Sequence, residues 1–129
     1  MIMRRLFVVA TLTLFLAACQ TVPVYTVENS AILTSSGKTP TLAQVRSSIL
    51  QAAASKTCSV KEIDSNTLVA RVGKNTIEVV VTIKYSRTKY SILYRDSTNL
   101  SYRDGMIRTK YNFWVKKLQG QIQSRLVAL

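Results

Sequence analysis

Few side chains in this sequence suit acid–base or metal chemistry. The 129 residues contain no histidine, so the commonest general base and the commonest metal ligand are both missing. Among the six acidic residues, only Asp96 and Asp104 fall in one predicted loop, where a pair of carboxylates can act on glycosidic bonds. Their surroundings, "RDSTN" and "RDGM", are more typical of turns in which an Asp side chain accepts hydrogen bonds from nearby backbone. We therefore predict a protein that is not an enzyme and that has no catalytic residues, no metal site and no cofactor.

Cys19 is the residue whose position most clearly indicates chemistry. It follows "MIMRR", which is basic, and an apolar run over residues 6–18 that ends in two alanines. A basic flank, an apolar stretch and small residues at the cleavage site are the parts of a secretory signal peptide. The apolar run is shorter than the roughly 20 residues that a helix needs to cross a bilayer, so we do not expect a permanent membrane span.

The sequence "LAAC" at residues 16–19 resembles the lipobox of bacterial lipoproteins. In such proteins a diacylglyceryl group is attached to the cysteine thiol, the signal is cut just before the cysteine, and the freed amine is usually acylated. The resemblance implies that residues 1–18 are a lipoprotein signal peptide and that lipidated Cys19 anchors the mature chain in membrane lipid. Gln20, rather than Asp, in the next position implies the outer membrane, with the domain facing the periplasm. The alternative is an ordinary secreted protein with a cysteine near its cleavage site.

Cys58 is the second cysteine, and it has no partner for an intramolecular disulfide once Cys19 is lipidated. In an oxidising compartment an unpaired cysteine is most often a small buried apolar residue. A mixed disulfide with another protein would instead require an exposed Cys58 with a stabilised thiolate. The sequence favours the buried residue and leaves the exposure of Cys58 open.

The charge balance is strongly basic. The chain has 18 Lys and Arg against 6 Asp and Glu, a formal net charge of +12, and removal of the signal takes away only Arg4 and Arg5. Such a balance favours polyanionic partners, which in an envelope are phosphate-bearing lipids and acidic polymers. A solvated basic surface that only keeps the domain soluble is the alternative.

The mature chain is predicted to divide into two parts. Residues 19–39 have no sustained period and contain scattered Ser, Thr, Pro and Gly, which predicts a flexible tether, although "PVYTV" alternates enough for an edge strand. Residues 40–129 are predicted to be a periplasmic α+β domain. Helical spacing predicts helices at 41–55, with a capping box at Thr41 and Gln44, and from Lys110 onward.

Three strands are predicted between the two helices, at 66–73, 75–85 and 89–96, because apolar residues alternate along each of them. We expect a three-stranded antiparallel meander packed on one face by the two helices, in the order α-β-β-β-α. The first hairpin has two alternative turns, at 73–74 or at 74–75, and the second would set Arg71 opposite Glu78. The second hairpin is predicted to pair Tyr85 with Tyr90.

Basic and aromatic residues interleave from residue 84 to residue 114. Such mixtures can stack on bases or sugars, but the spacing assigns most of these aromatic residues to the core. They are Tyr85, Tyr90, Tyr94, Tyr111 and Trp114. The candidate residues for binding a ligand or partner are Arg71, Lys84, Arg95, Arg103, Arg108 and Lys110, on a wider basic rim with Arg87, Lys89, Lys116 and Lys117.

The outer face of the predicted sheet is a second candidate surface. Val69, Val80 and Leu93 are expected to lie together on it, with Arg71, Lys84 and Arg95 around them. An apolar centre with a basic border is typical of a docking patch for another protein.

The order of motifs in residues 85–118 resembles that in a family of small, mostly uncharacterised lipoproteins of Gram-negative bacteria. A Tyr-Ser strand, an Asp-Ser-x-Asn-Leu-x-Tyr loop and a Tyr-Asn-x-Trp helix follow one another in that family. The corresponding residues here are Tyr90-Ser91, Asp96-Ser97-Asn99-Leu100-Tyr102 and Tyr111-Asn112-Trp114. The resemblance implies an envelope lipoprotein of α+β fold, and it implies no activity or substrate.

The sequence thus predicts a lipid-anchored outer-membrane lipoprotein with a non-enzymatic basic domain that binds an anionic lipid, a glycan or an envelope protein. The alternative is an adaptor subunit of an envelope assembly complex that docks through the outer sheet face. Binding that weakens strongly with salt would favour the first function, because salt screens exposed charges. We do not expect nucleic acid as the partner, and the oligomeric state stays open.

Overall fold

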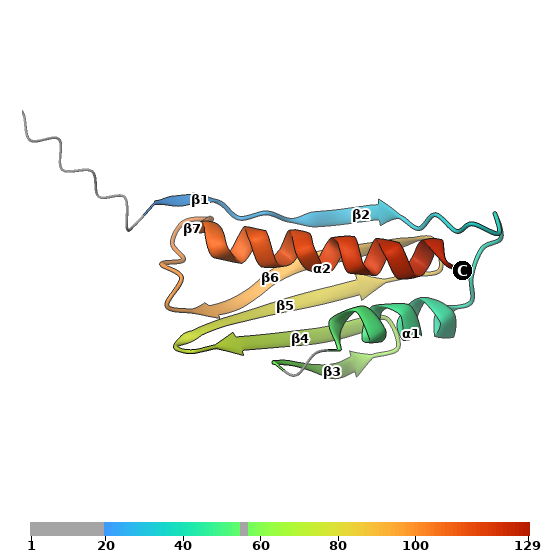
Figure 1. Cartoon of the computed structure of the whole chain (residues 1–129), viewed down its shortest axis with the longest axis horizontal. Helices are drawn as coiled ribbons and strands as arrows, with labels where there is room; N and C mark the ends of the chain where they lie inside the picture. The colour runs from blue at the N-terminus through green and yellow to red at the C-terminus, as the bar shows by residue number, and fades with distance from the viewer. Residues whose placement is uncertain (1–19, 55–56) are drawn as a thin grey trace, which may run out of the picture.

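The fold is known from a computed structural model that describes residues 20–54 and 57–129 (Figure 1). The predicted signal peptide and Cys19 lie outside the described residues, so lipidation of Cys19 stays a prediction. Within the part of the chain that the structure describes, no helix is long and apolar enough to span a membrane.

The centre of the fold is a five-stranded antiparallel sheet with the strand order β2-β6-β5-β4-β3. The strands are β2 (Val27–Ala31), β3 (Cys58–Asp64), β4 (Thr67–Lys74), β5 (Ile77–Tyr85) and β6 (Lys89–Thr98). A separate two-stranded sheet joins β1 (Thr21–Pro23) to β7 (Met106–Arg108). Both helices, α1 (Leu42–Ala53) and α2 (Thr109–Val127), lie on the same face of the large sheet (Figure 1).

The predicted α+β class is correct, but the three-stranded meander is wrong. The predicted strands are β4, β5 and β6, and the structure adds β3 at one edge and β2 at the other. Neither edge strand has the apolar alternation that identified the other three. In β3 only Cys58 and Val60 are even partly buried, and in β2 only Val27 is fully buried.

Residues 20–31 are ordered on the domain, although a flexible tether was expected there. The amide of Asn112 in α2 holds the link between β1 and β2: its Oδ1 accepts from Tyr25 N and its Nδ2 donates to Pro23 O, both at 2.8 Å. The Tyr25 hydroxyl donates to Gln119 Oε1 at 2.6 Å. These contacts come from α2, far along the chain, so the composition of the segment gave no sign of them.

The core lies between the helices and the inner face of the sheet. The Tyr85–Tyr90 and Ile83–Ile92 pairs of the second hairpin are confirmed, and the capping box at Thr41 and Gln44 is present. Both predicted turns of the first hairpin are wrong, because Lys74 pairs with Ile77 and leaves residues 75–76 as the turn. Asn75 has a φ of 57°, a conformation that Asn adopts more readily than most residues. Arg71 therefore lies opposite Val80 rather than Glu78.

The two helices cover unequal lengths of the sheet. α1 ends at Ala53, and in Figure 1 the ends of β4 and β5 near their turn extend well beyond it. α2 is longer and runs along the sheet from β7 to the C-terminus (Figure 1). The part of the inner face near the β4–β5 turn therefore lacks the cover of α1.

Candidate functional site

A cavity of about 400 Å³ lies where α1 ends, between α2 and the inner face of β3, β4 and β5. Small side chains leave this space open, since α1 contributes Ala52 and Ala53 and the start of β3 contributes Cys58. The other lining residues are Thr57, Val72, Lys74, Ile77, Val79, Lys110, Phe113, Trp114, Lys117, Leu118 and Gln121. We call this space the lysine-rimmed cavity.

The mouth of the lysine-rimmed cavity is positively charged. Lys74, Lys110 and Lys117 are exposed lining residues, and the described residues of the lining include no Asp or Glu. The ion pairs found among residues 20–54 and 57–129 join other residues, namely Arg46 to Glu62, Arg71 to Glu78 and Arg103 to Asp104. Three cations therefore converge on an apolar cavity without a neutralising carboxylate beside them.

Cys58 belongs to the wall of this cavity. It is a free, partly buried cysteine, and burial raises the pKa of its thiol above the ordinary value of 9.0. The thiol is therefore protonated at neutral pH and contributes a small, weakly polar surface. This environment agrees with the expected small apolar residue more than with a reactive thiolate.

The six predicted binding residues divide into two groups on different parts of the molecule. Lys110 lines the cavity, and Arg108 lies two residues before it, paired with Thr21 of β1. Arg103 lies in the loop before β7, its side chain almost fully exposed and its Nε 3.6 Å from Asp104 Oδ2. The remaining three, Arg71, Lys84 and Arg95, lie on strands of the large sheet away from the cavity.

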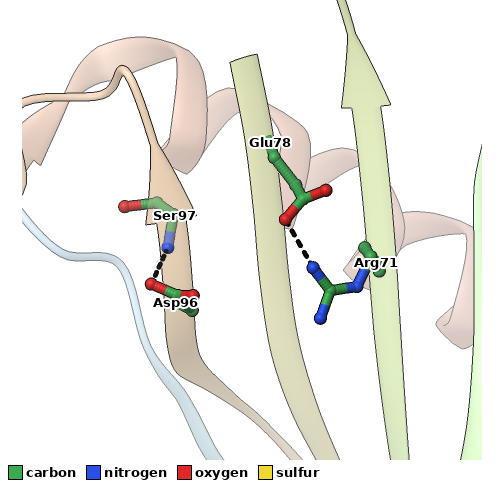
Figure 2. Close-up of polar contacts among 4 residues, drawn as sticks. All are labelled: Arg71, Glu78, Asp96 and Ser97. Carbon is green, nitrogen blue, oxygen red and sulfur yellow. Dashed lines mark hydrogen bonds and ion pairs between the residues drawn. The ribbon is translucent and has the colours of Figure 1, made fainter. Parts of the chain in front are cut away.

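The outer face of the sheet does not expose the expected apolar patch. Val69 is only 9% exposed and Val80 only 1%, so these valines are already covered, and Leu93 is only partly exposed. Arg71 lies opposite Val80 and points toward Glu78, with its Nη1 2.5 Å from Glu78 Oε1 (Figure 2). Arg95 Nη1 donates to Thr82 Oγ1 at 3.3 Å. Polar groups paired within the sheet thus make up much of this surface.

The expectation that both carboxylates lie in turns is met by Asp104 but not by Asp96, which lies within β6 opposite Val80 of β5. Asp96 Oδ1 accepts a hydrogen bond from the Ser97 backbone N at 2.8 Å (Figure 2), and Asp104 has a positive φ of 50° beside Gly105. Among the residues described by the structure, no three His, Cys, Asp or Glu side chains form a group suited to a metal ion.

The assignment of aromatic residues to the core is largely confirmed. Tyr85, Tyr90 and Tyr111 are buried, and Tyr94 and Trp114 pack against the core. The Tyr94 ring also stacks on Tyr102, with 4.0 Å between ring centroids.

Sequence reasoning identified only part of the lysine-rimmed cavity. Lys110 was a candidate and Lys117 belonged to the wider rim, and Cys58 was considered only for a mixed disulfide, but Lys74 and Phe113 were not singled out. The spacing of 110, 114, 117 and 121 does place four lining residues on one stripe of a helix, which is a signal that the sequence contains. Lys74 has no comparable signal, because only the folded sheet brings the β4–β5 turn toward α2.

Comparison with known proteins adds no relative to this description. The chain matches no protein-family model, no curated protein and no solved structure. The resemblance to small envelope lipoproteins rests on the sequence motifs and stays a prediction.

Proposed function

We propose that the chain is a lipid-anchored outer-membrane lipoprotein whose periplasmic domain has no enzymatic activity and binds an anionic component of the envelope. The lysine-rimmed cavity is the observation that carries this proposal. Lys74 comes from β4, whereas Lys110 and Lys117 come from α2, yet all three meet at one apolar cavity. A basic surface that served only solubility would not require its cations to gather in this way.

The position of the cavity fits an anchor at Cys19. Gln20 is the only residue between Cys19 and the start of β1, and Thr21 in β1 pairs with Arg108, which directly precedes α2. Lys110 follows in the first turn of that helix. A lipid on Cys19 would therefore hold this basic end of the domain close to headgroups. Anionic phospholipid or lipid A is the partner that this geometry favours.

The size of the expected effect follows from membrane electrostatics. Each Lys or Arg near an anionic bilayer contributes about 1 kcal/mol, so three lysines account for roughly a hundredfold in affinity. The contribution falls off within a Debye length, which is about 10 Å at 0.1 M salt. Binding should therefore weaken strongly as salt is added.

The proposal is tested with the whole mature chain carrying Cys19→Ser, which has no lipid, so that the lysine-rimmed cavity is free to reach added vesicles. Flotation should recover it with vesicles that contain phosphatidylglycerol or lipid A, and not with vesicles of phosphatidylcholine alone. The triple variant Lys74→Gln, Lys110→Gln, Lys117→Gln should lose roughly a hundredfold in apparent affinity. The matched control is Lys61→Gln, Lys84→Gln, Lys89→Gln, which removes the same charge from exposed strand positions outside the cavity and should lose far less.

Two results would contradict the proposal. One is equal recovery of the wild-type chain with anionic and neutral vesicles. The other is an equal loss in the two triple variants, because that would make net charge rather than the lysine-rimmed cavity responsible for binding.

A further inference from the structure

The lysine-rimmed cavity has two chemically different parts that together specify a kind of ligand. Its walls are largely apolar and its mouth carries the three lysines. A polyanion without an apolar part would leave the walls in water, and a neutral hydrocarbon would make no use of the lysines. We propose that the cavity holds one acyl chain of an anionic amphiphile, with the carboxylate or phosphate at Lys74, Lys110 and Lys117. This inference rests on the proposed function, since it names the part of the anionic lipid that the domain holds.

The volume of the cavity favours a single chain. Small-molecule sites occupy about 300–1,000 Å³, and a cavity of about 400 Å³ lies near the lower end of that range. A methylene group is about as large as a water molecule, whose share of the liquid is roughly 30 Å³, so the space holds on the order of a dozen carbons. One chain of a fatty acid or lysophospholipid fits this volume, whereas the two chains of a phospholipid exceed it.

Phe113 gives a second reason to expect an apolar ligand at this place. It lines the cavity, yet 73% of its surface is exposed, the largest exposed fraction among the large apolar side chains of residues 20–54 and 57–129. An aromatic ring beside an open apolar cavity extends the apolar surface to the mouth. An acyl chain that enters between Phe113 and the sheet would cover both the ring and the walls.

The order of groups along α2 matches the order of groups in an amphiphile. Leu118 is buried and Trp114 partly buried, so they face the deeper part of the cavity, while Lys110 and Lys117 are exposed on either side of Phe113. The tail would lie against Trp114 and Leu118, and the anionic head would stay at the surface, where the lysines remain hydrated. The head is therefore recognised without the cost of burying an unpaired charge.

Trp114 provides the test, because it is the only tryptophan in the chain and it lines the cavity. The whole mature chain in phosphatidylcholine nanodiscs is titrated with lauric acid, a fatty acid of about the length the cavity holds, that carries a nitroxide on its tail. We expect saturable quenching of Trp114 fluorescence, and we expect competition by unlabelled fatty acid. Competition by lysophosphatidylglycerol distinguishes a phosphate head from a carboxylate head.

Three comparisons separate binding in the cavity from partition into the bilayer. Cys58→Phe places a large ring in the wall, and it should abolish saturable quenching while circular dichroism stays native. A nitroxide phosphatidylcholine in the disc reports any quenching that comes from the bilayer alone. Each pair of added methylenes in the competing fatty acid should strengthen binding about tenfold until the cavity is full.

The head group is tested by comparing a fatty acid with the fatty alcohol of equal length. The wild-type chain should prefer the acid by at least tenfold, and the Lys74→Gln, Lys110→Gln, Lys117→Gln variant should bind both alike. Equal quenching of wild type and Cys58→Phe would overturn the inference. The inference would also be overturned if no saturable quenching were seen in a chain that still floats with anionic vesicles. The same holds if saturable quenching is absent because the lipid on Cys19 fills the cavity. In that last result the proposed function survives and only the acyl-chain inference fails.

Discussion

Tyr111 places a hydroxyl group inside the core. Its side chain is fully buried, and the hydroxyl has no hydrogen-bond partner among the residues that the structure describes. Burial, with smaller contributions from Tyr94 and Tyr102 nearby, raises the pKa of Tyr111 well above its ordinary value of 10.0. The tyrosine is thus tolerated for the packing of its ring rather than for a hydrogen bond of its hydroxyl.

Tyr111→Phe should therefore leave the free energy of unfolding unchanged or raise it, since it removes a buried polar group that has no partner. The matched control is Tyr25→Phe, which loses the hydrogen bond to Gln119 Oε1 and should cost about 1 kcal/mol. Urea denaturation of both variants measures the difference. A loss of more than 1 kcal/mol for Tyr111→Phe would mean that the hydroxyl has a partner.

The same variant changes the response to alkaline pH. The pKa of Tyr111 is higher in the folded protein than in the unfolded chain, where it is close to 10. Stability is therefore unaffected by this titration below pH 10, and it falls as the pH rises above 10, because only the unfolded chain then loses the proton readily. Above that pH the wild type should lose about 1.4 kcal/mol more per pH unit than Tyr111→Phe.

At the scale of elements, the central strands were predictable and the edge strands were not. β4, β5 and β6 bury one full face, so apolar residues recur at every second position along that face, as in Leu68, Ala70 and Val72. β2 and β3 lie at the edges, where few side chains reach the core and the alternation is lost. What fixes β2 is its pairing with β6, together with the hydrogen bonds between Asn112 of α2 and the link before it, and the local sequence does not encode either.

Val27 tests whether β2 is a working part of the fold. It is 4% exposed and packs in the core, whereas the preceding Thr26 is exposed. Val27→Ala should lower the free energy of unfolding by about 1.5–3 kcal/mol through lost burial and a residual cavity. Thr26→Ala should change it by less than about 0.5 kcal/mol. If residues 20–39 were a flexible tether, neither substitution would change the free energy of unfolding measured by urea denaturation.

The candidate site shows the same division between local and non-local information. Lys110, Trp114 and Lys117 share one stripe of α2, and periodicity alone places them together. Lys74 reaches that stripe because the β4–β5 turn falls at residues 75–76, one residue beyond the later of the two predicted turns. Cys58 reaches the same stripe because its strand, β3, pairs with β4. Sequence patterning did not reveal β3.

At the scale of the whole molecule, the ordered segment after residue 20 changes how the anchor would act. Only Gln20 lies between Cys19 and Thr21 of β1, and the two extended steps from residue 19 to residue 21 span about 7 Å. A flexible tether over 19–39 would let the domain turn freely, whereas this short link would hold the β1–β7 end at the membrane. The opposite end of the domain is where Ser35 N donates a hydrogen bond to Val127 O, at the last residue of α2. The length of α2, about 28 Å for its 19 residues, separates this end from the β1–β7 end.

This orientation predicts unequal access along the molecule. Arg108 is exposed beside Thr21, and its side chain makes no cap hydrogen bond, while Ser36 is exposed at the far end. We introduce Arg108→Cys or Ser36→Cys into a Cys58→Ser background, reconstitute the lipidated chain in vesicles and add a bulky, membrane-impermeant maleimide. The cysteine at 108 should react at least fivefold more slowly than the cysteine at 36, because the bilayer shields it.

A linker separates shielding by the bilayer from shielding by the domain itself. About 20 Gly and Ser residues inserted between Gln20 and Thr21 have an r.m.s. length of roughly 25 Å, enough to free this end of the domain. The insertion should bring the two labelling rates together, and so should detergent. Equal rates in the uninterrupted chain would show that the anchor leaves the domain free to turn, and the lysine-rimmed cavity would then have no fixed relation to the membrane. A rate difference that persists with the linker would place the obstruction within the domain and remove the membrane from the explanation.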